Sequence, residues 1–359
     1  MDRRSLITRS GLAGIMAAGV SPAVRGQTRV RWRLASSFPQ SLDTLYGAAE
    51  VFAQKVRQLS GGRFDVRVHP AGESLAAFDV VDAVQAGTLD AAHTAPHFFF
   101  GKDETFAIGG AIPFGLNSRQ MSAWTYGGNG LALMREFYAH YRLVHFPCGN
   151  TGAQMGGWMR QPISRLADLK GLKFRIGGLA GKVIERLGAM PQNTPGGEIY
   201  RALETGALDA AEWIGPYDDH RLAFHQVAPH YHYPGWWKGG LQLDLYIHHK
   251  AFAALSSEYK AIVEAASAHA HVITQAKYDA KNPSALKHLV AAGARLRPFP
   301  PDVMAEAFKQ SMALCDEIAA RNPHWKKVYT DYARFRADQN RWFRFTEATF
   351  DRYMQSRKL

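Results

Sequence analysis

The sequence predicts an α/β protein with two lobes of similar build. Val30–Ser36 alternates between apolar and polar residues as a strand does, Leu42–Leu59 carries apolar residues at helical spacing, and Phe64–Val68 alternates again. This β-α-β opening indicates a parallel sheet with crossover helices. At 359 residues, 47% of them apolar, the chain is long enough for two domains with sizeable cores.

A short internal repeat supports the second lobe. Ala83–Ala92 (AVQAGTLDAA) and Ala202–Ala211 (ALETGALDAA) share the pattern A-x-x-x-G-x-L-D-A-A. Each is typical of a helix end, a glycine cap and a short strand, although chance repetition of this common arrangement is the alternative. Ligands of open α/β sheets bind beyond the carboxyl ends of strands, so the repeat predicts a ligand site between the lobes.

The second half of the chain continues the alternation of strands and helices. Leu169–Ile176 is predicted to be a strand with Arg175 near its end, and Gln192–Pro195 is predicted to be another short strand. The pattern becomes mostly helical from Leu255 onward. The predicted helices of this half are 180–187, 198–205, 257–289, 301–320 and 325 to the end.

Aromatic residues gather in three places. The runs Phe98–Phe100 and Trp236–Trp237 are expected to line an apolar pocket or to belong to the core. The last helical stretch carries five rings at near-helical spacing, which must cover another surface, either of the same chain or of a partner subunit. These five are Trp342, Phe343, Phe345, Phe350 and Tyr353.

The first 26 residues have the features of a twin-arginine export signal. Arg3 and Arg4 precede a modestly apolar stretch from Gly11 to Val20, and the small residues up to Gly26 suit a cleavage site. A cytoplasmic N-terminal helix is the alternative. No run of 18 apolar residues follows, so a polytopic membrane protein is excluded, and the export signal predicts a periplasmic protein.

Charge and cysteine content narrow the class further. Lys and Arg number 43 against 31 Asp and Glu, a formal charge of +12, but the excess is scattered and not interleaved with aromatics, which argues against nucleic acid. With only Cys148 and Cys315, a disulfide framework is excluded. One bridge in an oxidising compartment and two buried free thiols remain as alternatives.

Motifs of the common catalytic classes are missing from the sequence. It has no G-x-S-x-G elbow, no G-x-G-x-x-G after a strand and no Walker loop. His230, His232 and the pair His248–His249 lack the spacing of zinc ligands and are interpreted as structural or surface residues.

Four polar residues near predicted strand ends are candidates for a ligand site. Arg175 can hold a carboxylate with two parallel hydrogen bonds, although a surface salt bridge is the alternative. Asn150 and Gln154 follow the predicted strand Leu143–Pro147 and offer amides to a carboxylate or a hard cation, or are ordinary turn residues. Glu212 is costly to bury unpaired, so it needs an arginine, a proton or a metal.

Five segments together resemble the extracytoplasmic solute receptors of tripartite ATP-independent periplasmic (TRAP) transporters. They are Ile112–Gln120 (IPFGLNSRQ), Asn150–Trp158 (NTGAQMGGW), Asp168–Gly178 (DLKGLKFRIGG), Gly196–Asp219 (GGEIYRALETGALDAAEWIGPYDD) and Tyr231–Gly240 (YHYPGWWKGG). GPYDD and PGWW point to the subgroup that binds 2-oxo acids such as pyruvate with a metal cation; a relative binds lactate with calcium. The resemblance implies a type II-like periplasmic binding protein with a long C-terminal helix.

The resemblance also implies which residues would hold the acid. Arg175 would pair with the ligand carboxylate, and Asn150 would add a hydrogen bond. A ring from Phe98–Phe100, such as Phe98 or Phe99, would close the first-lobe side. The family often has tyrosine there, so one hydroxyl donor is missing in this chain.

A metal cation, Na⁺ or Ca²⁺, is implied to bridge the protein and the acid. Gln154, the Glu212 side chain and the carbonyl of Trp213 would hold it, so that Gln154 and Trp213 also lie at the ligand. Gln242 or Asp244 would complete the shell.

The implied function is a periplasmic receptor without enzymatic activity. It would close around a small 2-oxo or 2-hydroxy monocarboxylate, deliver it to TRAP permease subunits in the inner membrane, and dimerise through its C-terminal helix. The expected divisions are the export signal 1–26, a first lobe 27–150, a second lobe 151–245 and a helical part 246–359 that completes and bridges the lobes.

Three alternatives stay open. The receptor could serve another acid, such as a dicarboxylate, a sugar acid or an aromatic acid. A second Arg or Lys in the cleft would favour a dicarboxylate, and the sequence offers no clear candidate. The chain could instead be a periplasmic enzyme with Glu212 as a base beside a metal, or a sensory subunit.

Overall fold

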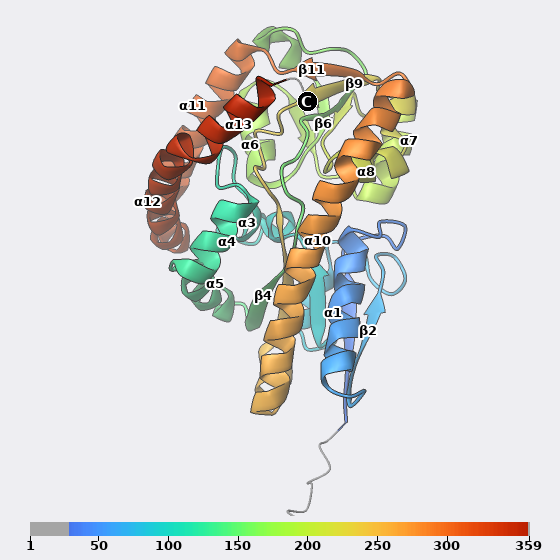
Figure 1. The fold of residues 1–359 in the computed structure, drawn as a ribbon, viewed down its shortest axis with the longest axis vertical. Coiled ribbons are helices and arrows are strands. Elements are labelled where there is room, and N and C mark those ends of the chain that lie inside the picture. Colours follow the sequence, from blue (N-terminus) through green and yellow to red (C-terminus); the bar gives the residue numbers. More distant parts are fainter. Residues whose placement is uncertain (1–28, 358–359) are drawn as a thin grey trace, which may run out of the picture.

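Two mixed sheets, each with helices packed around it, form the two lobes of the molecule (Figure 1). The computed structural model describes residues 29–357, so the predicted export signal at 1–26 lies outside the described residues. The sheet orders are β2-β1-β3-β10-β4 and β11-β9-β5-β8-β6-β7. The strands are β1 (Val30–Ser36), β2 (Phe64–His69), β3 (Ala91–Thr94), β4 (Leu143–Asn150), β5 (Gly157–Met159), β6 (Lys173–Arg175), β7 (Met190–Gln192), β8 (Ala210–Ala211), β9 (His230–Tyr233), β10 (Gln242–His248) and β11 (Arg295–Pro298).

Helices cover both sheets and make up most of the C-terminal third. The α-helices are α1 (Leu45–Leu59), α2 (Val80–Gln85), α3 (Phe106–Gly110), α4 (Ser118–Gly127), α5 (Gly130–Ala139), α6 (Gly178–Arg186), α7 (Ile199–Thr205), α8 (Pro216–Arg221), α9 (His249–Ala253), α10 (Ser257–Ala291), α11 (Pro301–Arg321), α12 (Pro323–Phe345) and α13 (Glu347–Gln355). Four 3-10 turns are η1 (Pro96–Phe99), η2 (Leu166–Leu169), η3 (Gly196–Glu198) and η4 (Phe224–Gln226). The predicted two-lobed α/β fold is confirmed.

The repeated segments take the same local structure in both lobes, as predicted. In each, a helix (α2 or α7) ends before a glycine, Gly87 or Gly206, whose φ is +75°. This left-handed conformation favours glycine because a Cβ would be strained there. A short buried strand follows, β3 in the first sheet and β8 in the second.

The chain returns to the first lobe after building most of the second. β10 pairs antiparallel with β3 and β4 and lies in the first sheet. The range 151–245 expected for the second lobe therefore ends inside a strand of the first lobe, and we propose a boundary just before Gln242. Helical residues beyond β10 pack against both lobes.

One predicted strand is much shorter than expected. Leu169–Ile176 was expected to be extended throughout, but only Lys173–Arg175 forms β6. Leu166–Leu169 makes the 3-10 turn η2, and Gly171 turns the chain with a φ of +75°. Two backbone N–H groups before η2 donate to the Asp168 carboxylate, and these local hydrogen bonds compete with a sheet ladder.

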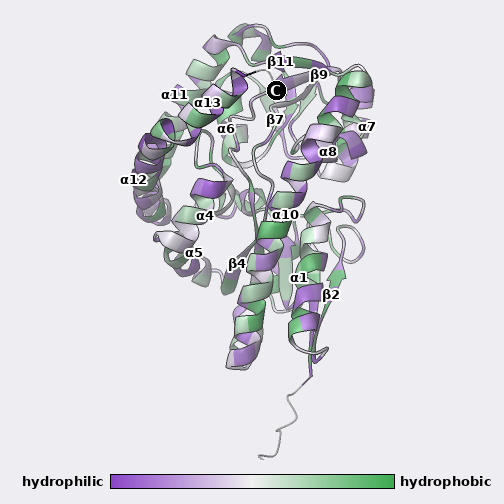
Figure 2. Cartoon of the chain, viewed as in Figure 1, coloured by the Kyte–Doolittle hydropathy of each residue, from purple (hydrophilic) through white to green (hydrophobic). Residues whose placement is uncertain are grey.

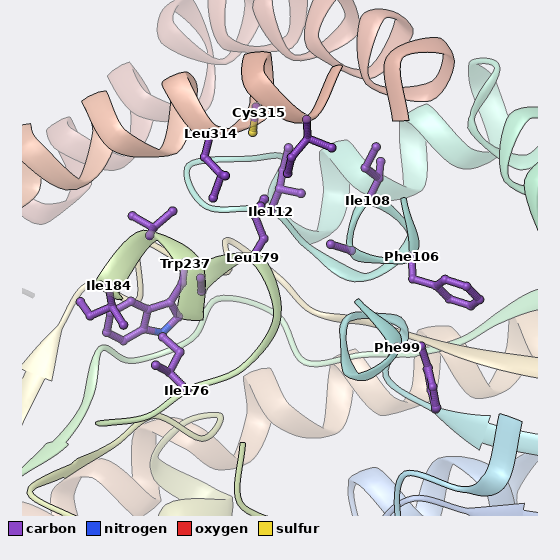
Figure 3. Close-up of a cluster of buried hydrophobic side chains, with 14 of the residues drawn as sticks. Phe99, Phe106, Ile108, Ile112, Ile176, Leu179, Ile184, Trp237, Leu314 and Cys315 are labelled. Carbon is purple, nitrogen blue, oxygen red and sulfur yellow. The ribbon is translucent and has the colours of Figure 1, made fainter. Parts of the chain in front are cut away.

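The C-terminal helices join the lobes. α10 packs along α1 and β4 of the first lobe and reaches α8 of the second (Figure 1). α11 packs on α6, whereas α12 packs on α4 and α5. Figure 3 shows the apolar cluster that results, in which Leu179 of the second lobe lies near Ile112 of the first and Leu314 of α11, and Ile184 lies beside Trp237.

Both cysteines are free and buried. Cys148 lies in the core between the first sheet, α1 and α10, and Cys315 lies on the buried face of α11, in the cluster of Figure 3. Of the two alternatives, one disulfide bridge or two buried free thiols, the structure supports the two free thiols.

Candidate functional site

Arg175 and Glu212 are brought together by two neighbouring parallel strands of the second sheet. Arg175 ends β6 and pairs in register with Ala211 of β8, so that Glu212 comes directly after it. The Arg175 Nη1 atom donates to the Glu212 carbonyl at 2.9 Å and to its Oε2 atom at 3.3 Å. The side chains are only 3% and 1% exposed, so this is a buried ion pair.

Lys238 adds a second cation to this pair. Its Nζ atom forms an ion pair with the Glu212 Oε1 atom, and its side chain is 6% exposed. The loop that carries Lys238 lies directly on the segment of Gln154. Gly235 N–H donates to the Gln154 carbonyl at 3.0 Å, and a Cβ on Gly235 would come within 2.6 Å of that oxygen. Only glycine allows this approach, which brings the backbone of the loop that carries Lys238 close to Gln154.

The charged cluster formed by Arg175, Glu212 and Lys238 carries a formal charge of +1. The indole of Trp213 lies over the Arg175 guanidinium, 4.9 Å from the ring centroid to Cζ. His97, on η1 of the first lobe, lies beside the cluster. Burial, followed by the charges of Lys238 and Arg175, holds the pKa of His97 well below its usual value of 6.5. The imidazole is therefore neutral, and the cluster keeps its single net charge.

Arg175 is held firmly, but one end of its guanidinium makes no hydrogen bond within the described residues. Its Nε atom donates to the Thr194 carbonyl at 2.9 Å, and its Nη1 atom is taken by Glu212. Within residues 29–357, no hydrogen bond uses its Nη2 atom. An anion can therefore approach the guanidinium without displacing the contacts that position it.

Asn150 and Gln154 each present one polar atom without a partner. Asn150 accepts from the Gly152 N–H at 3.0 Å, and Gln154 donates to the Thr151 hydroxyl at 3.0 Å. Among the described residues, the Asn150 Nδ2 donor and the Gln154 Oε1 acceptor are buried with no hydrogen-bond partner. Buried polar atoms are normally paired, so such orphans point to a bound molecule. Asn150 offers a donor for an anion, and Gln154 offers an oxygen for a cation.

Gln242 lies next to Asn150 in the β4–β10 pair but turns toward the first lobe. Its Nε2 atom donates to the Gly109 carbonyl and to Asp244, both at 3.0 Å, whereas its Oε1 atom has no partner among the described residues. Burial raises the pKa of Asp244 to about 8, beside Tyr138 and Tyr246. In the described part of the chain, no hydrogen bond or ion pair links Gln242 or Asp244 to Glu212.

The three phenylalanines face different surroundings. Phe98 packs against His97 at 4.6 Å and Phe78 at 5.0 Å between ring centroids, so it reaches the neighbourhood of the charged cluster. Phe99 lies in the first-lobe core near Phe106 (Figure 3). Phe100 is partly buried against the same core.

Lys238 and His97 are site residues that the sequence analysis missed. Lys238 follows Trp236–Trp237 in a glycine-rich segment, where a lysine is ordinarily exposed. Its one sequence signal is its place in the same short motif as PGWW. His97 stands one residue before Phe98, and the prediction considered only the phenylalanines of that run.

The oxygen atoms near the charged cluster are of the chemical types that bind a hard cation. A carboxylate, a side-chain amide oxygen and a backbone carbonyl are typical ligands of Ca²⁺ and Na⁺, and Glu212, Gln154 and Trp213 can provide them. Residues 29–357 contain no group of three His, Cys, Asp or Glu side chains placed to hold a metal, so a cation here would depend on neutral oxygens. None of the described helices is long and apolar enough to cross a membrane.

Comparison with known proteins gives a consistent result. Residues 35–322 match the family described as bacterial extracellular solute-binding protein, family 7. The chain is 41% identical to a monocarboxylate 2-oxoacid-binding periplasmic protein of Nostoc sp., over 99% of this chain and 100% of that protein.

Two solved structures of TRAP solute-binding proteins are similar in fold and sequence. The one from Bordetella bronchiseptica is 43% identical, with a TM-score of 0.90 over 92% of this chain and 98% of that one. It is a mixed-occupancy dimer with copurified calcium and picolinate in one site. The one from Pseudoalteromonas atlantica is 34% identical, with a TM-score of 0.88 over 92% and 100% of the chains, and it holds sodium and pyruvate.

These matches confirm the resemblance derived from the sequence motifs. The proteins of this family are solute-binding receptors of the periplasm rather than enzymes. The chain belongs to family 7 of the bacterial extracellular solute-binding proteins, the solute-binding proteins of TRAP transporters.

Proposed function

We propose that this chain is a non-enzymatic periplasmic receptor that captures a small 2-oxo or 2-hydroxy monocarboxylate and delivers it to a TRAP permease. The observation that carries the proposal is the buried charged cluster, in which Arg175 keeps a free guanidinium end. The unpartnered Asn150 Nδ2 donor supports a second contact to the same anion. The Nostoc relative, named for 2-oxoacids, and the pyruvate-bound relative favour the same ligand class.

The charge balance favours a monocarboxylate over a dicarboxylate. Lys238 is the second cation that would favour a dicarboxylate, but Glu212 neutralises one of the two positive charges. With no metal cation bound, a monoanion brings the cluster to zero net charge, whereas a dianion leaves an uncompensated buried negative charge. Such a charge is costly in a dry site.

A cation at the acid is the second part of the proposal. Gln154, Glu212 and the Trp213 carbonyl are the proposed ligands, and Gln242 remains a candidate because its Oε1 atom is unpartnered. Two similar structures hold calcium or sodium together with a small acid, which supports this assignment.

A thermal-unfolding screen of the protein without its export signal tests the receptor function. Pyruvate, lactate, succinate, galacturonate and picolinate are each added in EDTA, where the charge argument applies, and in CaCl₂. A ligand at a hundred times its Kd adds about 2.7 kcal/mol of stability, which raises the Tm visibly. We expect the largest increase with pyruvate or lactate. A larger increase with succinate in EDTA contradicts the charge argument, and no increase with any acid in either buffer contradicts the receptor function.

The proposed receptor is also a homodimer. Five large apolar side chains near the C-terminal end of the described chain are between 38% and 76% exposed: Trp342, Phe345, Phe350, Tyr353 and Met354. A surface of this kind is typical of a protein interface. The dimeric Bordetella relative favours a second copy of this chain as the partner.

A further inference from the structure

We propose that Lys238 is a built-in cation of the ligand site, whose ammonium group competes with Na⁺ or Ca²⁺ for the Glu212 carboxylate. The inference concerns the site named above and rests on the proposed function for the identity of the acid. It assigns to Lys238 the control of how strongly the site depends on a metal cation.

Both oxygens of the Glu212 carboxylate are already engaged. Lys238 Nζ forms an ion pair with Oε1, and Arg175 Nη1 donates to Oε2 at 3.3 Å. The three side chains are 6%, 3% and 1% exposed for Lys238, Arg175 and Glu212. A cation that takes Glu212 as a ligand must therefore displace one of these two groups or share an oxygen with it.

Lys238 is the group that can leave. Arg175 is fixed by the Thr194 carbonyl, the Glu212 carbonyl and the Trp213 ring. Among the described residues, the Lys238 ammonium has Glu212 as its one hydrogen-bond partner. A lysine is a compact point charge on a flexible four-carbon chain, so it can withdraw without moving the backbone.

Charge balance makes Lys238 and a monovalent cation equivalent at this position. With Lys238 in place, Arg175, Lys238 and Glu212 sum to +1, and a bound monocarboxylate brings the site to zero. With Na⁺ in place of the ammonium, the sum is the same. Holding both cations with one acid leaves a buried positive charge without a counter-ion, which is unfavourable. One of the two therefore occupies Glu212 at a time.

Titration calorimetry with CaCl₂ as the probe and no acid present tests the competition directly. Lys238→Met removes the ammonium but keeps an unbranched side chain of similar length. We expect the variant to bind calcium at least ten times more tightly than the wild type. Lys102→Met, which removes the lysine paired with Asp82, is the matched control and is expected to bind calcium like the wild type. Equal affinity in the wild type and Lys238→Met overturns the proposal.

Pyruvate binding in EDTA and in CaCl₂ is the second measurement. The wild type has its own cation, so its pyruvate affinity is expected to differ less than threefold between the two buffers, whereas Lys238→Met loses at least tenfold in EDTA. If the wild type itself loses tenfold in pyruvate affinity in EDTA, the proposal is overturned. This outcome can be read even if Lys238→Met does not fold. If no acid binds to either protein, the proposed function fails, and the calcium titration still decides the role of Lys238.

Discussion

Arg175 shows how one residue is made ready for an anion. Four contacts hold its guanidinium, to the Thr194 carbonyl, the Glu212 carbonyl, the Glu212 carboxylate and the Trp213 ring, and none of the three hydrogen bonds uses Nη2. At the proposed acid site the side chain would therefore lose little further conformational entropy on binding, because it is already fixed. This preorganisation depends on the planar guanidinium, which an ammonium does not reproduce.

Arg175→Lys should weaken pyruvate binding about thirtyfold, which corresponds to about 2 kcal/mol for a lost charge-assisted hydrogen bond. Titration calorimetry with CaCl₂ present measures the change. Arg186→Lys is the control, because Arg186 makes a two-pronged contact with Glu317 on the surface. Wild-type affinity in Arg175→Lys would remove this residue from the acid site.

Glu212 supports the site in a different way, as the counter-ion of two buried cations. Glu212→Ala leaves Arg175 and Lys238 facing each other, and breaking a buried ion pair typically costs about 3–5 kcal/mol. We expect a loss of this size in urea unfolding. We also expect excess CaCl₂ to raise the Tm of the wild type, where calcium displaces Lys238 from Glu212, and to leave the Tm of the variant unchanged. A calcium effect that survives in the variant would show that Glu212 is not a cation ligand.

The sequence predicts Arg175 and Glu212 of the candidate site, but it does not predict that Lys238 pairs with Glu212. Arg175 ends a strand and Glu212 directly follows one, and the rule that parallel strands end at one edge is enough to expect them together. Lys238 belongs to no strand or helix. It reaches the site because Gly235 lies on the Gln154 carbonyl, a contact 81 residues apart in the chain that spacing alone does not reveal.

At the scale of elements, the short helix α8 ties the two lobes to α10. Asp218 accepts a hydrogen bond from Thr44, at the start of α1, and another from Tyr278 of α10. The neighbouring Asp219 turns into the second lobe and accepts from Trp158 and Tyr231. The two aspartates of the GPYDD motif are therefore both buried, and each binds a different part of the molecule: Asp218 binds α10 and the start of α1, and Asp219 binds the second lobe.

Asp219 makes stability depend on pH. Burial, followed by weaker effects that include the charge of Asp218, raises the pKa of Asp219 to about 7 from 3.8. The folded protein therefore holds a proton that the unfolded chain releases, so the free energy of unfolding falls as pH rises from about 4 to about 7. Asp219→Asn does not ionise at this position. The free energy of unfolding of the variant minus that of the wild type should therefore increase by on the order of 2 kcal/mol from pH 5 to pH 8.

Urea unfolding of both proteins at pH 5 and pH 8 measures this gain. Asp168→Asn is a suitable control, because hydrogen bonds from the Ser164 N–H and from Arg165 lower the pKa of the exposed Asp168 carboxyl. Its difference from the wild type should stay constant over this range. An Asp219→Asn difference that is equal at both pH values would mean that Asp219 is ionised in the folded protein throughout.

The observed ends of helices and strands agree with the predicted ones where the sequence has a clear capping residue. They differ where local side-chain hydrogen bonds compete with the hydrogen bonds of a sheet. Ser256 accepts from the Tyr259 N–H and starts α10 one residue later, at the predicted Ser257. In contrast, the Asp168 carboxylate draws the chain before β6 into a turn, although the apolar pattern of that segment suits a strand.

At the scale of the whole molecule, the lobes are linked by more than one passage of the chain. The strand β4 leads out of the first lobe, β10 leads back into it, and α10 runs along both. The sequence predicted two lobes from the repeat, but it did not predict that β10 completes the first sheet. A strand that pairs with neighbours 92 or more residues away has a register set by tertiary packing, which local periodicity does not report.

The start of α12 has side chains buried against the rest of the chain, whereas the side chains at the end of α12 and throughout α13 are partly or fully exposed. The first half of α12 buries Trp325, Val328 and Tyr332 against the first lobe, whereas its end and α13 leave large rings exposed. Figure 2 shows that α12 is mostly hydrophilic, so these rings stand out on a polar helix. A helix end of this kind is stabilised when a second copy covers it, because apolar area is removed from water.

Light scattering coupled to gel filtration tests the dimer. We expect the protein without its export signal to be dimeric, and we expect the double variant Phe345→Ser with Phe350→Ser to be monomeric, because the two rings are 76% and 65% exposed in one chain. Val272→Ser removes a side chain that is 64% exposed on α10 and should leave the dimer intact. A monomeric wild type, or a double variant that stays dimeric, would show that these rings cover no second copy.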